Sequence, residues 1–101
     1  MTDTNPDFSL EIHDNAAENR FEAVHDGDII GVITYSLEGN RFNINETVVD
    51  SAGKGHGVGS ALARTVLESR RNQPGKVVVN CPFVASWVSK HPEIRDGLEI
   101  Q

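Results

Sequence analysis

The chain has 101 residues, of which 38% are hydrophobic and 24% charged, and its formal net charge is −6. These values suit one globular domain and exclude a disordered chain. The acidic balance excludes a protein that holds nucleic acid through a broad basic surface, because such binding neutralises phosphates with Lys and Arg. No apolar run reaches the roughly 20 residues that span a bilayer, and residues 1–10 are too polar for a secretion signal, so we expect a cytoplasmic protein without membrane contacts.

The ends of the chain and its cysteine content set further limits. Residues 1–8 show no periodicity, so we expect a disordered tail there, then one domain over residues 9–95 and a frayed C-terminal tail over residues 96–101. Cys81 is the single cysteine, which excludes an internal disulfide and a multi-cysteine metal site. We therefore expect no bound metal.

Several stretches in the first half of the chain have the composition of β-strands. Leu10 and Ile12 alternate with polar residues, and the later stretches are rich in β-branched and aromatic residues. Asp26-Gly27 is a pair that a tight hairpin favours, because both positions need positive φ. The first half is therefore predicted to form an antiparallel meander of three or four strands, at residues 10–12, 21–25, 29–37 and 41–49.

The second half changes to a helical pattern. Residues 50–53 (Asp-Ser-Ala-Gly) break the last meander strand, and apolar residues then recur at helical spacing over about residues 58–71. Residues 76–80 are short and β-branched, so they predict a buried strand that pairs parallel after a crossover helix. Residues 83–90 predict a helix whose apolar stripe lies in the core, at Phe83, Val84, Trp87 and Val88. The predicted fold class is α/β (α+β).

Glycines occupy positions 53, 55, 57 and 59, between the last meander strand and the first helix. Glycine lets the backbone approach a ligand closely, and a helix start leaves N–H groups without partners. The positive end of the helix dipole adds to the attraction for an anion, and Lys54 and His56 are near enough to assist. The loop is therefore predicted to be an anion site.

Three other interpretations of this loop compete. A nucleotide triphosphatase loop needs a Gly-Lys-Ser/Thr end, which Gly59-Ser60-Ala61 lacks. A dinucleotide-binding loop should follow the first strand of a βαβ array, whereas this loop follows a meander. A plain flexible turn stays open as the third interpretation, because a glycine motif alone is weak evidence.

The order of the predicted elements resembles the GNAT superfamily of N-acetyltransferases. Residues 54–59 (Lys-Gly-His-Gly-Val-Gly) are similar to the Gln/Arg-x-x-Gly-x-Gly/Ala pyrophosphate loop of that superfamily, with Lys54 where Gln or Arg is usual. The resemblance is to the small, minimal GNAT-like domains and covers about residues 21–93. Its other matching segments are residues 46–49, residues 80–87 and residues 91–93.

The resemblance implies acetyl-coenzyme A as the cosubstrate and an amine as the acceptor. It implies that Thr47, Val48 and Val49 end the strand that pairs with the pantetheine arm. The residues that it assigns to the pyrophosphate are Lys54, Gly55, His56, Gly57, Val58, Gly59 and Ser60. Glu46 departs from the small family, which usually has His before Thr at this place, so the role of that imidazole is not carried over.

Acetyl transfer to an amine needs a base for the amine proton and stabilisation of the developing oxyanion. Glu46 is the candidate base, acting through water, and a surface carboxylate is the alternative. Cys81 follows the strand after the helix, where its thiol could carry a covalent acetyl group, whereas a buried cysteine that only packs is the commoner case. His91 is expected to cap a helix, and Tyr35 to pack in the sheet.

Two functions from different classes follow from this pattern. The first is an acetyl-coenzyme A dependent N-acetyltransferase that acts on a small-molecule or protein amine, supported by the glycine loop, Glu46 and Cys81. The second is a non-catalytic module that binds or senses acyl-coenzyme A, suggested by the missing family His. Turnover separates the two, because only the first releases free coenzyme A.

Overall fold

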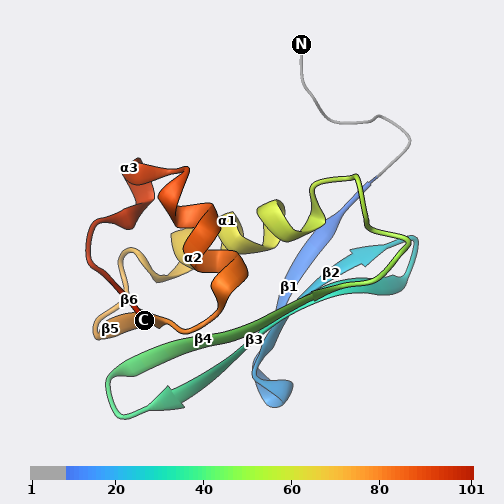
Figure 1. Cartoon of the computed structure of the whole chain (residues 1–101). Helices are drawn as coiled ribbons and strands as arrows, with labels where there is room; N and C mark the ends of the chain where they lie inside the picture. The colour runs from blue at the N-terminus through green and yellow to red at the C-terminus, as the bar shows by residue number, and fades with distance from the viewer. Residues whose placement is uncertain (1–8) are drawn as a thin grey trace.

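The computed structural model describes residues 9–101 and holds one mixed sheet of six strands that lie side by side in chain order (Figure 1). The tail predicted for residues 1–8 lies outside the described residues. A short 3-10 helix, η1 (Ala16–Glu18), joins the first two strands. The strands are β1 (Glu11–Asn15), β2 (Arg20–His25), β3 (Asp28–Glu38), β4 (Arg41–Val49), β5 (Lys76–Val79) and β6 (Leu98–Ile100).

The predicted antiparallel meander is confirmed. β1 to β4 pair with one another in antiparallel order. The hairpin between β2 and β3 turns at Asp26 and Gly27, whose φ angles are 52° and 83°. Both angles are positive, as a tight primed turn requires, so the local sequence alone determines this turn.

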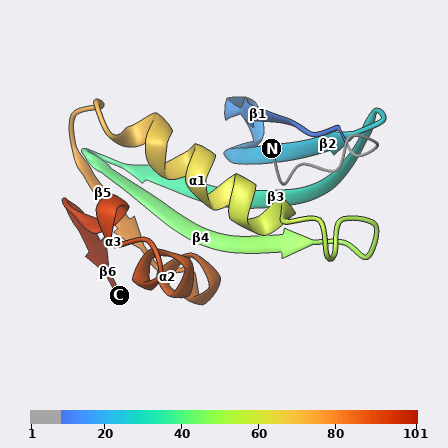
Figure 2. The same ribbon diagram turned by 90° about the horizontal axis from the view of Figure 1, so that it is seen from above.

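The predicted strand-helix-strand unit is also confirmed. α1 (Val58–Arg70) connects β4 to β5, and these two strands pair parallel. Figure 2 shows α1 running across the middle strands, with α2 (Pro82–Ser89) and α3 (Pro92–Arg95) beside it. Within residues 9–101 these α-helices cover one face of the sheet and leave the other face without helices. Fully buried side chains of the core include Ile33, Ile44, Leu62, Val66 and Val79.

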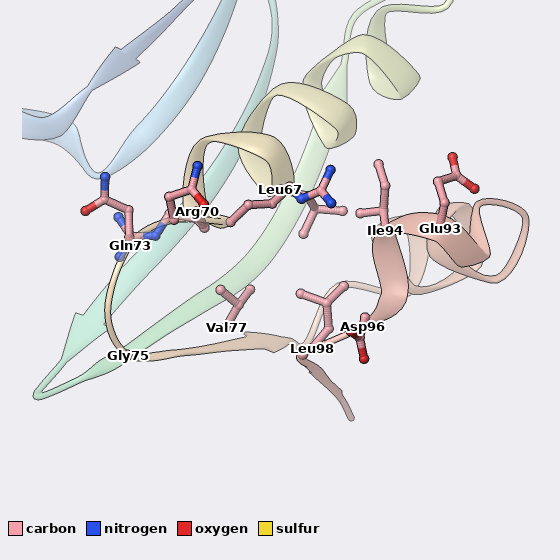
Figure 3. A pocket seen from close by; sticks show the side chains of 12 residues that line it. Leu67, Arg70, Gln73, Gly75, Val77, Glu93, Ile94, Asp96 and Leu98 are labelled. Carbon is pink, nitrogen blue, oxygen red and sulfur yellow. The ribbon is translucent and has the colours of Figure 1, made fainter.

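A hollow of about 430 Å³ lies at the C-terminal end of α1 (Figure 3). Leu67 of α1 and Ile94 of α3 line it from the helix side, and Val77 of β5 and Leu98 of β6 line it from the sheet side. The glycine loop is at the opposite end of α1, so this hollow is separate from the predicted anion site. Among residues 9–101, no helix is long and apolar enough to cross a membrane.

The C-terminal tail predicted for residues 96–101 is wrong, because the chain folds back onto the sheet there. β6 pairs parallel with β5, and the N–H of Gln101 donates to the Val79 carbonyl at 2.9 Å. A strand of three residues is too short to show a period in the sequence. Its stability comes from partners distant in the chain, which local patterns do not report.

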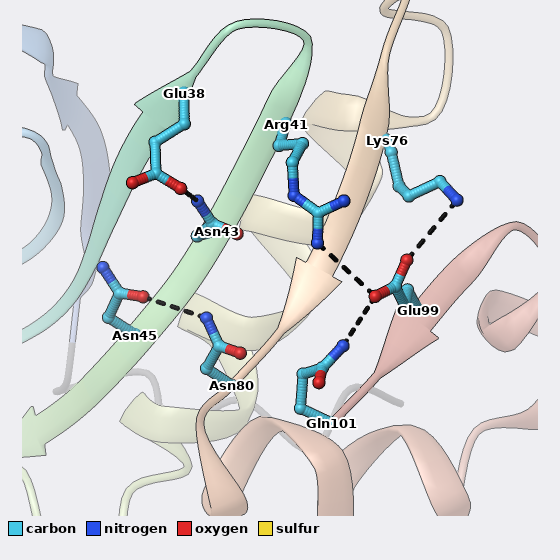
Figure 4. Close-up of polar contacts among 8 residues, drawn as sticks. All are labelled: Glu38, Arg41, Asn43, Asn45, Lys76, Asn80, Glu99 and Gln101. Atoms are coloured by element: carbon cyan, nitrogen blue, oxygen red, sulfur yellow. Dashed lines mark hydrogen bonds and ion pairs between the residues drawn. The ribbon is translucent and has the colours of Figure 1, made fainter.

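A polar network on the helix-free face attaches β6 to the neighbouring strands (Figure 4). The Glu99 carboxylate contacts Arg41 and Lys76 at 3.4 Å each and accepts a hydrogen bond from the Gln101 side chain at 2.6 Å. The hydrogen bond from Lys76, assisted by the charge of Arg41, holds the pKa of Glu99 below its usual range. Glu99 therefore stays ionised and links three strands at neutral pH.

Candidate functional site

The loop between β4 and α1 requires glycine at two positions for its backbone shape. Gly55 and Gly57 have φ angles of 82° and 72°, a region that residues with side chains rarely adopt. A Cβ atom at either position would meet nothing within 4 Å, so packing does not demand the glycines. His56 between them keeps a negative φ. Such alternation turns successive N–H groups toward one side and forms a concave anion-binding surface.

The start of α1 leaves a row of backbone donors without partners. The first helical hydrogen bond runs from the N–H of Ala61 to the carbonyl of Gly57 at 2.9 Å, and no side chain of the described residues caps the helix. The N–H groups that find no acceptor among residues 9–101 belong to Gly55, Gly57, Val58, Gly59 and Ser60. Lys54 is exposed beside them. These donors, the helix dipole and the ammonium together suit an anion such as a pyrophosphate.

The start of α2 lies against the start of α1. The indole N–H of Trp87 donates to the hydroxyl of Ser60 at 2.7 Å. The ring of Phe83 packs on Gly59 so closely that a Cβ there would lie 2.8 Å from the ring. Within the described chain, the N–H groups of Phe83 and Val84 have no partner, because the first helical bond of α2 begins at Ala85. Two positive helix ends therefore meet at one place.

β4 and β5 separate next to these two helix ends. The last paired residues of the two strands are Ile44 and Val79, and the N–H of Asn80 donates to the Ile44 carbonyl at 2.9 Å. Beyond this point β4 continues to Val49, whereas the chain after β5 turns away into α2. β3 pairs with only one edge of β4, so the other edge over residues 46–49 is open as far as residues 9–101 are concerned.

A bulge in β4 decides which backbone groups face this open edge. Ile44 and Glu46 oppose the consecutive residues Tyr35 and Thr34 of β3, so Asn45 is an additional residue. After the bulge, the N–H of Asp50 donates to the Ile30 carbonyl of β3 at 3.0 Å. Because alternate residues of a strand direct their backbone groups to opposite edges, those of Thr47 and Val49 face the open side.

Cys81 lies at the gap between β4 and β5, on the face of the sheet that the helices cover. It is the N-cap residue of α2 and only 3% exposed. Its sulfur is 3.3 Å from the hydroxyl oxygen of Thr47, which links the end of β5 to the open part of β4. The structure therefore brings Cys81 together with one of the predicted pantetheine residues, in a packed setting.

Glu46 lies on the other side of the same gap. Neighbouring residues of a strand point to opposite faces, and Thr47 points toward Cys81 on the helix side, so Glu46 points to the helix-free face. Its side chain is exposed there. The structure therefore does not bring the Glu46 carboxylate and the Cys81 thiol together on one face, and an acyl group would have to lie in the gap to reach both.

Tyr35 is a core residue and lies far from the loop, as its predicted packing role requires. Its ring stacks on Phe42 at 4.6 Å between centroids, and its hydroxyl donates to Asp14 at 2.7 Å. Burial, followed by this hydrogen bond, raises the pKa of Tyr35 to about 12. Such a phenol does not supply a proton readily near neutral pH.

His91 caps α2, which confirms its predicted structural role. Its N–H donates to the Val88 carbonyl at 2.9 Å, and its ring nitrogen Nδ1 is 2.8 Å from the Trp87 carbonyl oxygen. A carbonyl oxygen only accepts, so Nδ1 carries the proton. The ring also stacks on the Trp87 indole at 3.8 Å between centroids.

Sequence reasoning missed one residue of the site. Phe83 was predicted to be core, but 43% of it is exposed, and it lies over the first turn of α1. The error has a local cause, since Phe83 is in the first turn of α2 and projects beyond the sheet toward Gly59. The pair Gly59 and Phe83, a glycine opposite an aromatic residue, could have signalled this helix contact.

Comparison with known proteins identifies the family of the chain. The sequence profile of the GCN5-related N-acetyl-transferases matches residues 20–97. A GCN5-like protein from Staphylococcus aureus, proposed to be an N-acetyltransferase, is similar in fold, with 24% identity, a TM-score of 0.65, and coverage of 96% of this chain and 93% of that one. A nourseothricin acetyltransferase is similar over 87% of this chain and 68% of its own, with 20% identity and a TM-score of 0.49. No curated protein sequence matches. The profile covers most of the chain, which therefore belongs to the GCN5-related family and is an N-acetyltransferase.

Proposed function

We propose that the protein transfers the acetyl group of acetyl-coenzyme A to the nitrogen of a small-molecule or protein amine. The observation that carries this proposal is the set of N–H groups at the start of α1 that find no acceptor among residues 9–101, those of Gly55, Gly57, Val58, Gly59 and Ser60. A pyrophosphate bridges such donors well, because its charge is spread over several acceptor oxygens. Lys54 and His56 lie in the same loop and would contact the phosphates from its rim.

The open edge of β4 supports a place for the rest of the coenzyme. The pantetheine arm is an extended chain with two amide groups, which can pair with strand backbone as an added strand would. Thr47 and Val49 offer backbone groups on that edge, and Val48 between them keeps the strand extended. The pantetheine would then run from the loop toward the gap, with its thioester near Thr47 and the start of α2.

The transfer itself needs one bond to form and one to break. The neutral amine attacks the thioester carbonyl carbon, the C–N bond forms, and the C–S bond breaks to release the thiolate of coenzyme A. Glu46 takes the amine proton through water, because its carboxylate is exposed on the face from which an acceptor can approach. The free N–H groups of Phe83 and Val84 suit the developing oxyanion.

Direct attack by the amine is favoured over a covalent acetyl group on Cys81. The cysteine is 3% exposed and its sulfur contacts Thr47, so it is packed rather than presented to a thioester. Cys81→Ala is expected to retain turnover within about tenfold, since it removes packing but no proton acceptor. Turnover lost in Cys81→Ala but kept in Glu46→Gln would instead establish the covalent route.

Calorimetric titration with acetyl-coenzyme A tests the coenzyme site. Gly57→Glu should weaken binding by about 100-fold or more, because it strains the loop and places a carboxylate at the anion site. Gly27→Glu is the matched control, since Gly27 also has a positive φ, of 83°, and a Cβ there meets nothing within 4 Å. Absence of binding at about 1 mM, or equal binding by the two variants, would overturn the proposal.

Release of free coenzyme A in the presence of a broad panel of amines tests the transfer. Release faster than in buffer is expected with at least one amine, and Glu46→Gln should lower it. If coenzyme binding is intact but no amine accelerates release, the function is that of an acyl-coenzyme A binding module. The two measurements therefore separate loss of the coenzyme site from loss of chemistry.

A further inference from the structure

The residues that line the hollow at the C-terminal end of α1 include an apolar group and a charged group (Figure 3). Its apolar part consists of Leu67, Val77, Ile94 and Leu98, which belong to four different elements. Its volume of about 430 Å³ is in the range of sites that hold small molecules. The hollow therefore has the size and the apolar surface to hold a small organic molecule.

Residues of opposite charge are among those that line the hollow. Arg70 and Arg71 come from the end of α1, and Glu93 and Asp96 come from α3 and the residues after it. Among residues 9–101 no ion pair joins these arginines to these carboxylates. Glu93 has only a long contact of 3.9 Å to Arg64, outside this set. Arg71 and Asp96 therefore have no ion pair among the described residues.

Arg70 carries a donor that is left unused. Its guanidinium lies over the Phe42 ring at 4.2 Å, and its Nε is buried with no hydrogen-bond partner in the part of the chain that the structure describes. A buried donor without a partner costs free energy unless a ligand or water satisfies it. Cations at a helix end favour the helix dipole, which explains the arginines but not the Asp96 carboxylate, which has no ion pair among the described residues.

From this arrangement we infer that the hollow binds a small zwitterion whose carboxylate and ammonium are separated by an apolar stretch. The carboxylate contacts Arg70 and Arg71, the ammonium contacts Asp96, and the stretch between them packs on Leu67 and its apolar neighbours. An ω-amino acid or a short peptide has this pattern of charges. A ligand with only one charged end leaves one side of the hollow unpaired.

This site is distinct from the proposed coenzyme site. α1 has 13 residues, so its two ends are about 20 Å apart. No residue of the glycine loop lines the hollow. The ligand is therefore not the amine that reacts at the gap, and its binding stands whether or not the protein uses acetyl-coenzyme A.

Titration of the whole chain with ε-aminocaproate, followed by NMR, tests the inference. We expect saturable shifts of the amide signals of Leu67, Val77 and Leu98. Caproate and hexylamine, which each lack one charged end, are expected to bind about tenfold more weakly. Arg71→Gln and Asp96→Asn should each weaken binding by about tenfold, and both residues are exposed, so the fold should persist.

Arg95→Gln is the control, since Arg95 is exposed on α3 and does not line the hollow. It should bind like the wild type. The inference is overturned if no saturable shift occurs up to about 10 mM, or if caproate or hexylamine binds as tightly as ε-aminocaproate. It is also overturned if Arg71→Gln and Asp96→Asn bind no more weakly than Arg95→Gln.

Discussion

The two ends of α1 are built for different purposes. At the N-terminal end, Gly55 and Gly57 meet open space and leave backbone donors unpaired. Beyond the C-terminal end, a Cβ at Gly75 would collide with the carbonyl of Asn40, and the N–H of Arg71 closes the last turn of α1 on Glu68 at 3.3 Å. Glycine thus serves ligand access at one end and close backbone approach at the other. Substitution of these glycines should therefore damage coenzyme binding at Gly55 and Gly57 and folding at Gly75.

The largest effect is expected for Glu46→Gln, next to the N-terminal end of α1. Turnover should fall by about 10² to 10³-fold, because the variant cannot accept the amine proton, while affinity for acetyl-coenzyme A should not change. Steady-state kinetics and calorimetry on the same preparation measure both. Glu18→Gln, an exposed change in η1, is the control. Equal turnover in the two variants would remove Glu46 from the mechanism.

Gly75→Ala tests the packing end. It should lower the free energy of unfolding by about 2 to 3 kcal/mol, because its φ of 102° is unfavourable for alanine and the new Cβ collides with the Asn40 carbonyl. Gly39→Ala has a positive φ of 59° but open space around the Cβ, so it should cost only about 1 kcal/mol. Urea unfolding measures both values. A similar cost at both positions would mean that the collision relaxes freely.

Gly59→Ala tests whether the contact between the two helix starts matters for the coenzyme. Its Cβ would lie 2.8 Å from the Phe83 ring, so the exposed ring must move, and we expect about a threefold to tenfold loss of coenzyme affinity. Adding Phe83→Leu should restore part of the loss by making room. If the double variant binds more weakly than Gly59→Ala, the ring itself contributes to binding.

The smallest effect on stability at neutral pH is expected for the ionisation of Tyr35, near the C-terminal end of α1. Its pKa is raised from 10.0 to about 12, so its stabilising contribution is complete below pH 10.0 and is lost as the pH rises through about 12. Tyr35 is the only tyrosine, so ultraviolet titration of tyrosinate reports it alone. Asp14→Asn should move the midpoint downward. A midpoint near 10 in the native protein would contradict the burial of Tyr35.

Much of this fold could be predicted from local sequence. The Asp26-Gly27 hairpin, the helix over residues 58–70 and the strand over residues 76–79 each carry their own signal of turn chemistry, period or β-branching. β6 carries no such local signal. It is held in the sheet by the Glu99 carboxylate, which contacts Arg41 and Lys76 of the neighbouring strands. Contacts between segments distant in the chain are not encoded in any local pattern.

The candidate site likewise has parts that could be predicted from the sequence and parts that could not. The glycine loop could be found in the sequence because its residues are contiguous. The bulge at Asn45 and the separation of β4 from β5 could not, because both depend on how strands pair. The opposite faces of Glu46 and Cys81 follow from that pairing, so the sequence could name both residues but not their arrangement.

The open edge of β4 has a consequence for the stability of the sheet itself. An unpaired edge inside a sheet exchanges its amide hydrogens with water and invites pairing with another extended chain. The amides of Thr47 and Val49 should therefore exchange rapidly in the free protein. A coenzyme arm bound along this edge would act as an additional strand, and hydrogen exchange at these two amides should slow. Without coenzyme, the sheet would then lack one strand, which the bound coenzyme arm supplies.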